Sequence, residues 1–248
     1  MYFNDVHIMI YTAFAIIGGI IGQFVDYCNR CFLKEEKIFS KESFLKYKRI
    51  ILPNYWLIAI NAIGYIALTY KFGIHSGLIE NLDLIKYIVL LPMLLCAFVV
   101  DLKEQIIPNR LNLLMFEIGL VFVFLHGFIN INIAANMLLG MLAGGGIFIL
   151  ITLLGGLIAG KEAMGMGDVK LMGALGLYFG LQNIVVISVL AFLIGAVGSV
   201  IYMIINRKNA NAYIPFGPFI VISSVITIFV PFSILFTILM ETFTLGMY

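Results

Sequence analysis

Long runs of apolar residues, separated by short polar segments, constrain this chain more than any other feature of its sequence. Of its 248 residues, 62% are hydrophobic and only 11% are charged, whereas soluble domains average about 25% charged residues. A run of about 20 apolar residues crosses the hydrocarbon core of a bilayer as a helix. Because a soluble core of this size cannot bury so much apolar surface, the sequence predicts an all-α polytopic membrane protein.

The apolar runs predict about eight transmembrane helices. They are expected over residues 6–27, 50–70, 84–100, 111–128, 134–159, 169–181, 184–205 and 214–240. The sixth run is short, because at about 1.5 Å per residue it reaches only about two-thirds of the way across the hydrocarbon core. The first run follows no basic segment and precedes no small-residue cleavage pattern, so we expect a retained helix and not a signal peptide.

The basic residues predict the orientation of these helices. With the N-terminus outside, all but Lys71 and Lys86 of the 15 Lys and Arg residues fall in the inner loops, as cytoplasmic loops require. The same charge distribution favours counting the short sixth run as a crossing. Without that crossing, Arg207 and Lys208 would fall on the outer face.

The predicted organisation has no separate soluble domain. We expect a two-helix region over residues 1–83, with a basic cytoplasmic loop at 28–49, and a six-helix core over residues 84–248. The loop has two readings: a basic anchor that holds anionic lipid, which we favour, or a docking surface for a charged segment of a partner.

Two carboxylates at the ends of apolar runs are the candidate catalytic residues. Asp168 follows a glycine-rich turn that begins at Gly165, and Asp101 directly follows the run 84–100. A charged group at a membrane boundary is costly and points to function. Taken singly, Asp168 also suits a helix N-cap and Asp101 an ordinary charged helix end. With N-terminus-out topology both fall at the inner face, where we expect them to meet.

A pair of close carboxylates suits the hydrolysis of a peptide bond. The reaction needs an activated water and a proton donor for the leaving amine. Two carboxyl groups that share a site do not both ionise, so one accepts a proton from water while the other, still protonated, polarises the scissile carbonyl.

The sequence allows two roles for each of three further features. The stretch from Tyr213 to Phe219 holds two prolines and a glycine, so it either lines a cavity and pairs with an extended substrate or forms a proline-rich helix entry. Glu117 is either hydrogen-bonded inside the bundle, which we favour, or a modulator of the site. Cys28 and Cys31 form one CxxC, which is half of a zinc site or, as we favour, two free thiols on a cytosolic loop.

Three motifs, taken together, resemble the type IV prepilin peptidases, bacterial membrane aspartyl proteases of the GxGD type. They are the Asp101 segment with Ile107-Pro108-Asn109, the run Gly165–Leu171 and the run Pro215–Phe219. They occur in the order of the family, and the resemblance covers residues 90–225.

The resemblance implies a site near the cytoplasmic face of the bacterial cytoplasmic membrane. There the family cleaves the basic leader from prepilins or pseudopilins, and Asp101 and Asp168 correspond to its catalytic pair. We expect further residues of the motifs to shape the site or bind substrate: Gly165, Gly167, Lys170, Pro108, Asn109, Pro215, Phe216, Gly217 and Pro218.

The N-terminal part departs from the pattern of the family, whose members often carry two CxxC pairs and methylate the product with S-adenosylmethionine. This chain has one CxxC, and Gln23, Asp26 and Trp56 stand where the family usually has serine, asparagine and glutamate. We therefore expect no cofactor, neither zinc nor S-adenosylmethionine, and no methylation.

The expected partners are a prepilin or pseudopilin and the lipid bilayer, with no nucleic acid. The oligomeric state and the pilin system served, whether pilus, competence or secretion, stay open. Two alternative functions are a carboxylate-lined transporter, since glycine-broken helices and buried acids also mark transporters, and a non-catalytic pilin-assembly subunit.

Overall fold

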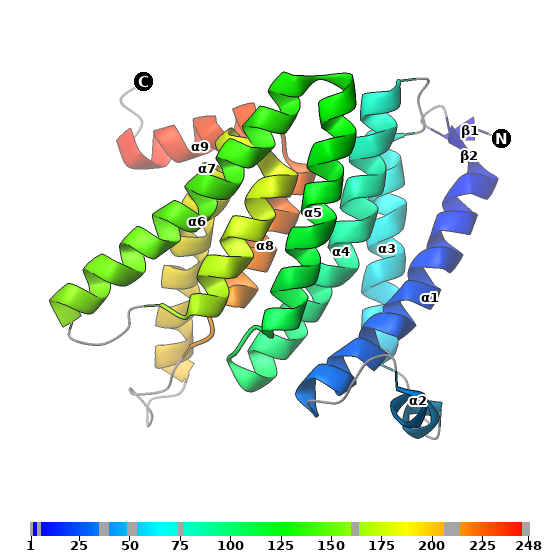
Figure 1. Cartoon of the computed structure of the whole chain (residues 1–248), viewed down its shortest axis with the longest axis horizontal. Helices are drawn as coiled ribbons and strands as arrows, with labels where there is room; N and C mark the ends of the chain where they lie inside the picture. Colours follow the sequence, from blue (N-terminus) through cyan, green and yellow to red (C-terminus); the bar gives the residue numbers. More distant parts are fainter. Residues whose placement is uncertain are drawn as a thin grey trace. The chain divides into compact units, whose positions relative to one another are not determined.

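The computed structural model is almost entirely helical and describes residues 2–3, 6–34, 40–48, 54–73, 77–159, 164–205 and 214–244 (Figure 1). The helices are α1 (Ile8–Leu33), α2 (Lys41–Lys48), α3 (Tyr55–Phe72), α4 (Leu78–Glu104), α5 (Asn109–Ile129), α6 (Ile131–Ala159), α7 (Met166–Ile205), α8 (Gly217–Phe229) and α9 (Phe232–Thr244). Two short strands, β1 (Tyr2–Phe3) and β2 (Val6–His7), pair antiparallel before α1. The predicted all-α class is confirmed.

The helices form two compact units, Met1–Glu104 and Gln105–Tyr248. The first unit holds α1 to α4 and the second holds α5 to α9. This grouping by contact places α4, with Asp101 near its end, beside α1 and α3. The functional regions predicted at 1–83 and 84–248 remain a prediction.

In the first unit, α1 and α3 pack closely along small residues. A Cβ atom added at Gly18 would lie 2.9 Å from the Cα atom of Ala62, and one at Gly22 would lie 2.8 Å from the Cα atom of Ile58. The side-chain amide of Asn61, buried in this contact, donates to the Gly18 carbonyl at 2.7 Å. The glycines at this spacing therefore let the two backbones approach, as small residues do in membrane helices.

Helix α4 continues through Pro92, and a tyrosine from α3 compensates for the missing donor. Proline has no N–H, so the carbonyl of Ile88, four residues earlier, loses its helical hydrogen bond. The hydroxyl of Tyr65, which is fully buried, donates to that carbonyl at 2.9 Å.

This compensation predicts a coupled effect on stability. Tyr65→Phe leaves the Ile88 carbonyl without a partner, which costs about 1–3 kcal/mol of unfolding free energy. In a Pro92→Ala background the alanine N–H supplies the bond, so we expect the same tyrosine change to cost clearly less. Thermal unfolding of the four proteins in one detergent measures the coupling, and equal costs in both backgrounds would contradict it.

The described residues of the segment predicted as the loop 28–49 are mostly helical, which corrects that prediction. Helix α1 continues to Leu33, and α2 forms a separate short helix. The continuation contains no glycine or proline, and Arg30 pairs with Asp26 one turn earlier, with 3.1 Å between Nε and Oδ2. Such pairs stabilise a helix, so the polar composition of the segment did not end it.

In the second unit, α6 packs against the first half of α7 with almost no side chains between the backbones. A Cβ atom added at Gly140 would lie 2.5 Å from the Gly176 carbonyl oxygen, and one at Gly144 would lie 2.5 Å from the Met172 carbonyl oxygen. The partner numbers fall as the α6 numbers rise, so these two segments run antiparallel.

The second half of α7 runs the other way along the same helix. A Cβ atom added at Gly144 would lie 2.9 Å from Ile184, and the rings of Phe148 and Phe192 are 5.5 Å apart between centroids. Here both numbers rise together, so α6 and this half are parallel. The two halves of α7 therefore form a helical hairpin, which Figure 1 shows as a yellow-green and a golden segment.

The reversal occurs at Gly180, which has a left-handed φ of 71°. Glycine adopts this conformation without steric cost, and the next backbone N–H, of Leu181, donates to the Asn136 side chain at 3.2 Å. The sequence predicted a boundary between the runs 169–181 and 184–205, and the structure places the break at Gly180, near the end of the first run.

The last predicted run, 214–240, is not one helix, which corrects that prediction. Helix α8 ends at Phe229, Val230 is extended (φ −102°, ψ 128°), and α9 begins after Pro231. The ring of a proline disfavours helical backbone at the preceding residue. Figure 1 shows α9 lying crosswise to α8.

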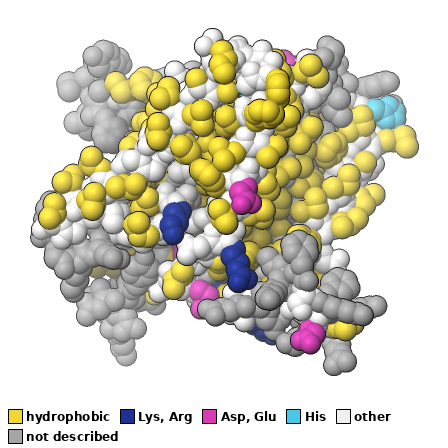
Figure 2. All heavy atoms as spheres, in the orientation of Figure 1, with side chains coloured by type: hydrophobic (Ala, Val, Ile, Leu, Met, Phe, Trp, Pro, Cys, Tyr) yellow, Lys and Arg dark blue, Asp and Glu magenta, His cyan; other side chains and the backbone are white. Residues whose placement is uncertain are grey.

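The exposed surface is that of a membrane protein. Within the described part of the chain, five helices are long and apolar enough to cross a membrane: α1, α4, α5, α6 and α7. Figure 2 shows hydrophobic side chains over most of the described surface that faces the viewer. The polytopic membrane class is thus confirmed, while the number of crossings and the orientation stay predictions. Some of the inner-loop basic residues, among them Lys37, Lys161, Arg207 and Lys208, lie outside the described residues.

Candidate active site

Asp168 lies in the first turn of α7 and is buried, with 5% of its surface exposed. Its backbone N–H donates to the Gly165 carbonyl at 3.0 Å, and that of Val169 donates to the same carbonyl at 3.4 Å. The glycine-rich turn therefore closes directly onto the helix that carries the carboxylate.

The start of α5 holds this turn in place. The side-chain amide of Asn112 donates to the Gly167 carbonyl at 3.0 Å, and the ammonium of Lys170 donates to the Asn109 side chain at 2.8 Å. Ile107 packs against Gly167, where an added Cβ atom would lie 3.3 Å from the Cβ atom of Ile107. Two of the predicted motifs, Ile107-Pro108-Asn109 and the glycine-rich turn, are thus in direct contact.

Asn112 is a site residue that the sequence analysis missed. It is 3% exposed, and it follows Asn109 by one helical turn, so both side chains lie on the same side of α5. A second asparagine at this spacing in an otherwise apolar run was the available signal, since polar groups inside a membrane segment need partners.

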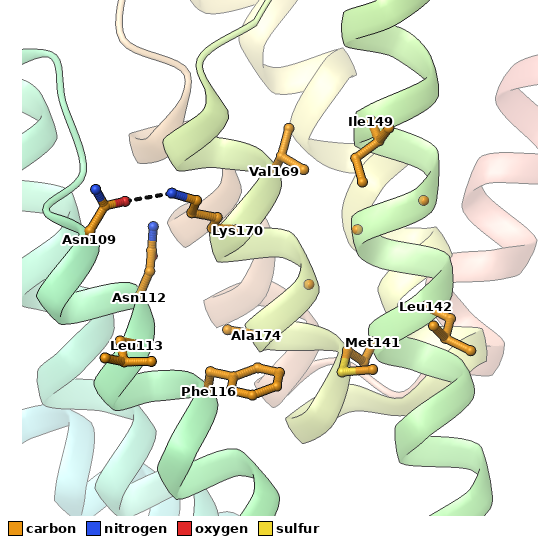
Figure 3. Close-up of a pocket in the computed structure, with 13 residues that line it drawn as sticks. Asn109, Asn112, Leu113, Phe116, Met141, Leu142, Ile149, Val169, Lys170 and Ala174 are labelled. Carbon is orange, nitrogen blue, oxygen red and sulfur yellow. Dashed lines mark hydrogen bonds between the residues drawn. The ribbon is translucent and has the colours of Figure 1, made fainter.

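A cavity of about 680 Å³ adjoins the turn, between α5, α6 and the first half of α7 (Figure 3). Asn109, Asn112 and Lys170 form its polar side, and the rest of its lining is apolar or glycine: Leu113, Phe116, Met141, Leu142, Gly145, Gly146, Ile149, Val169, Gly173 and Ala174. Its volume is that of a ligand-binding pocket. The cavity begins at Val169, the residue next to Asp168.

Asp101 lies in the last turn of α4, in the first unit, and is 3% exposed. Both predicted catalytic carboxylates are therefore buried groups at the ends of apolar helices, one in each unit. The structure does not test their pairing, which stays a prediction.

The Pro215–Phe219 motif is a helix entry packed on the second half of α7. Helix α8 begins at Gly217, with Pro218 in its first turn, and the Phe216 ring lies 5.1 Å from that of Phe192. Gly195 makes room for this ring, since an added Cβ atom would lie 3.1 Å from it. None of the motif residues lines the cavity described above, so their predicted contact with substrate stays a prediction. Tyr213, at the predicted start of this stretch, lies outside the described residues.

Three other residues lie elsewhere in the structure than the sequence predicted. Glu117 lies on the exposed side of α5, not inside the bundle. Cys28 and Cys31 form no disulfide, and they are buried within α1 and not on a loop. The predicted position of the two cysteines rested on a helix that ends near residue 27, whereas α1 extends past position 31. Position 117 lies within α5, and the register of this helix turns it outward.

The contact between Asn112 and Gly167 leads to a prediction for activity. Asn112→Leu keeps the approximate volume but removes the donor, so the turn loses its link to α5. If the turn positions a reacting carboxylate, peptide cleavage should fall about tenfold or more, since small displacements of reacting groups have large effects on rate. Leader cleavage with purified variants measures this.

Asn183→Leu is the matched control. Its amide also donates to a backbone carbonyl, that of Phe179, at 3.1 Å, but within α7 itself. We expect cleavage by this variant at the rate of the unchanged protein. Equal losses in both variants would mean that Asn112 acts only through general stability.

Known proteins match the same part of the chain. The sequence model of the type IV leader peptidase family matches residues 88–200. The chain is 32% identical over 137 residues to a prepilin leader peptidase/N-methyltransferase of Legionella pneumophila, which covers 55% of this chain and 47% of the relative. It is 32% identical over 124 residues to that of Aeromonas hydrophila, covering 50% and 42%, and 31% identical over 130 residues to that of Escherichia coli (strain K12), covering 52% and 56%.

The chain aligns with about half the length of these curated relatives, and no solved structure matches it. The matched segment contains both Asp101 and Asp168, the glycine-rich turn before α7, the start of α5 and the cavity. Residues 88–200 of this chain thus match the type IV leader peptidase family.

Proposed function

We propose that the chain is a prepilin leader peptidase that hydrolyses a peptide bond with Asp101 and Asp168 as an acid–base pair. One observation carries the proposal: a buried carboxylate at the start of α7, held through its turn by α5, in the segment that matches the family. The second buried carboxylate, Asp101, belongs to the same matched segment.

The proposed mechanism uses the two carboxyl groups in different protonation states. The ionised group takes a proton from a water molecule as that water attacks the scissile carbonyl. The protonated group donates a hydrogen bond to the carbonyl oxygen and then a proton to the leaving amine. Burial favours this division of roles, because a low dielectric disfavours two negative charges in one site.

The remaining predicted residues take supporting roles in this proposal. Gly165 and Gly167 allow the tight turn, while Asn109 and Lys170 close the polar side of the cavity. The apolar remainder of the cavity suits the hydrophobic part of a membrane-embedded substrate. Pro108 is the N-cap residue of α5 and sets the helix start from which Asn109 and Asn112 reach the turn.

We further propose that the active site faces the cytoplasm in the bacterial cytoplasmic membrane and that the chain acts on prepilins or pseudopilins. The hydrolysis needs neither zinc nor S-adenosylmethionine, since carboxylates and water supply all the groups that react. The names of the relatives include an N-methyltransferase activity. We propose that this chain lacks it, because Gln23, Asp26 and Trp56 depart from the pattern of the family and one CxxC remains.

Co-expression with a prepilin from the same organism tests the proposal. We expect a shortened product whose mass corresponds to an unmethylated new N-terminus. A product heavier by one methyl group would keep the peptidase and contradict the absence of methylation. An uncleaved prepilin that copurifies with the folded protein would favour a non-catalytic assembly subunit, and proton-coupled uptake without cleavage would favour a transporter.

A further inference from the structure

A second, smaller cavity lies within the first unit, where the ends of α1, α3 and α4 meet. Its volume is about 270 Å³. It is lined by Asp26, Asn29, Arg30, Leu33, Lys34, Asn54, Leu57, Val99 and Lys103. Six of these side chains are polar or charged, so the cavity differs in chemistry from the apolar one beside Asp168.

The charges of this cavity sum to a positive value. The one acidic side chain among its described lining residues, Asp26, accepts from Arg30 Nε at 3.1 Å and from the Tyr47 hydroxyl at 3.2 Å. Lys34 and Lys103 add two cations to this neutralised pair. Because these two cations line the cavity, it favours a negatively charged ligand.

A buried amide in the lining has no partner in the described part of the chain. Asn29 is 2% exposed, and neither its Nδ2 nor its Oδ1 atom makes a hydrogen bond to a described residue. A buried amide without partners is unfavourable, and an oxygen-rich ligand would accept from Nδ2.

The start of α3 adds a second source of positive potential. Asn54 is the N-cap residue of this helix, yet its side chain makes no capping bond. The first N–H groups of a helix carry partial positive charge and bind anions such as phosphate. The cavity therefore combines a helix start, two lysines and an unpaired amide, which is the donor set of a phosphate site.

The place of the cavity along the helices indicates where that phosphate comes from. Both α1 and α4 are candidate membrane spans, and Lys34 and Lys103 stand at their C-terminal ends. Trp56, which is 80% exposed, lies two positions after Asn54. Tryptophan is enriched at membrane interfaces, which is the depth of lipid headgroups.

We propose that this cavity binds the phosphate group of an anionic phospholipid, with Asn29, Lys34 and Lys103 as donors. The proposal concerns lipid recognition by the first unit and does not depend on peptide cleavage. It gives the basic segment after residue 28 a specific ligand site in place of a general attraction to the membrane surface.

Trp56 provides the measurement, because it is the only tryptophan of the chain. The full protein is reconstituted in bilayers that mix phosphatidylcholine and phosphatidylglycerol. In one sample the phosphatidylcholine carries brominated chains, which quench tryptophan fluorescence, and in the other sample the phosphatidylglycerol carries them. The ratio of quenching gives the relative affinity at this end of α3. We expect a clear preference for phosphatidylglycerol in the unchanged protein.

Lys103→Gln should lower that preference about fivefold, the contribution of one lysine near an anionic surface. Asn29→Asp, of similar shape but negatively charged, should lower it further. Lys71→Gln is the matched control, since Lys71 lies at the opposite end of α3 and does not line the cavity. It should leave the preference unchanged.

The outcomes separate a lipid site from a site for free phosphate. No preference in the unchanged protein, together with a rise of its melting temperature in inorganic phosphate that Lys103→Gln abolishes, would assign the site to free phosphate. No preference and no such rise would overturn the proposal. An equal effect of Lys71→Gln and Lys103→Gln would also overturn it, because the preference would then reflect net charge alone.

Discussion

Asp101→Asn and Asp168→Asn are each expected to lower the rate of leader cleavage about a thousandfold or more, within the range of general acid–base catalysis. Asparagine keeps the shape of the side chain but neither accepts a proton from water nor donates one to the leaving amine. Because the two groups act as one unit, the double variant should be no slower than the slower single variant. Purified variants in detergent, assayed by the mass of the product, measure the rates.

Glu104→Gln is the control for charge removal near Asp101. Glu104 lies in the same last turn of α4 but is exposed, so we expect its variant to cleave at the unchanged rate. Full activity in either aspartate variant, with wild-type melting temperature, would reject the acid–base pair. Independent, multiplying losses would mean that the two groups do not act together.

Gly176→Ala is expected to have the largest effect on stability. A Cβ atom at this position would collide with the backbone carbonyl of Gly140, a rigid neighbour. The helices α6 and α7 would have to separate, which we expect to lower the unfolding free energy by about 3 kcal/mol, as overpacking of a filled contact does. Since α7 carries Asp168, cleavage should fall as well.

Gly173→Ala, on the same helix, separates this collision from the general effect of alanine. There the nearest atom to an added Cβ is the Cα of Gly145, at an ordinary distance of 3.7 Å. Both changes gain the same helix propensity, so we expect Gly173→Ala to be neutral or slightly stabilising. Thermal unfolding of both variants checks this. Equal melting temperatures would show that the helices tolerate the extra atom.

The sequence was most informative where composition and backbone chemistry act locally. Apolar runs of about 20 residues predicted the helices, since a helix satisfies the backbone hydrogen bonds of such a run within lipid. Gly165 and Gly167 predicted the turn before Asp168. The short run 169–181, followed at once by the run 184–205, predicted a break between them. Gly180 makes this break with a left-handed backbone.

Predictions failed where a neighbour in space decides the outcome. The polar residues after position 27 suggested a loop, but the ion pair of Arg30 with Asp26 and the burial of Cys31 keep α1 helical. Asn112 has no local signature, because its role depends on a carbonyl 55 positions away in the sequence. Glu117 was assigned to the interior because it is charged, whereas the register of α5 turns it outward.

Pro92 and Pro231 show the same distinction within one residue type. Pro231 ends a helix, as its chemistry predicts, and α8 stops before it. Pro92 lies inside α4 without ending it, because the Tyr65 hydroxyl satisfies the carbonyl that the proline leaves open. A donor from another helix cannot be predicted from the sequence around the proline.

The most direct test of the central proposal is whether the two carboxylate positions come together in the membrane. Asp101→Cys and Asp168→Cys are combined in a chain whose native Cys28, Cys31 and Cys96 are changed to alanine, and a short thiol-specific cross-linker is added to intact membranes. A protease site introduced between positions 101 and 168 lets the chain be cut into two fragments. We predict that the cross-link keeps the two fragments together after this cut. A pair of Asp168→Cys with Leu78→Cys, at the far end of α4 from Asp101, should give none. Absence of the 101–168 cross-link in a variant that keeps the melting temperature of the cysteine-free chain would contradict the shared site.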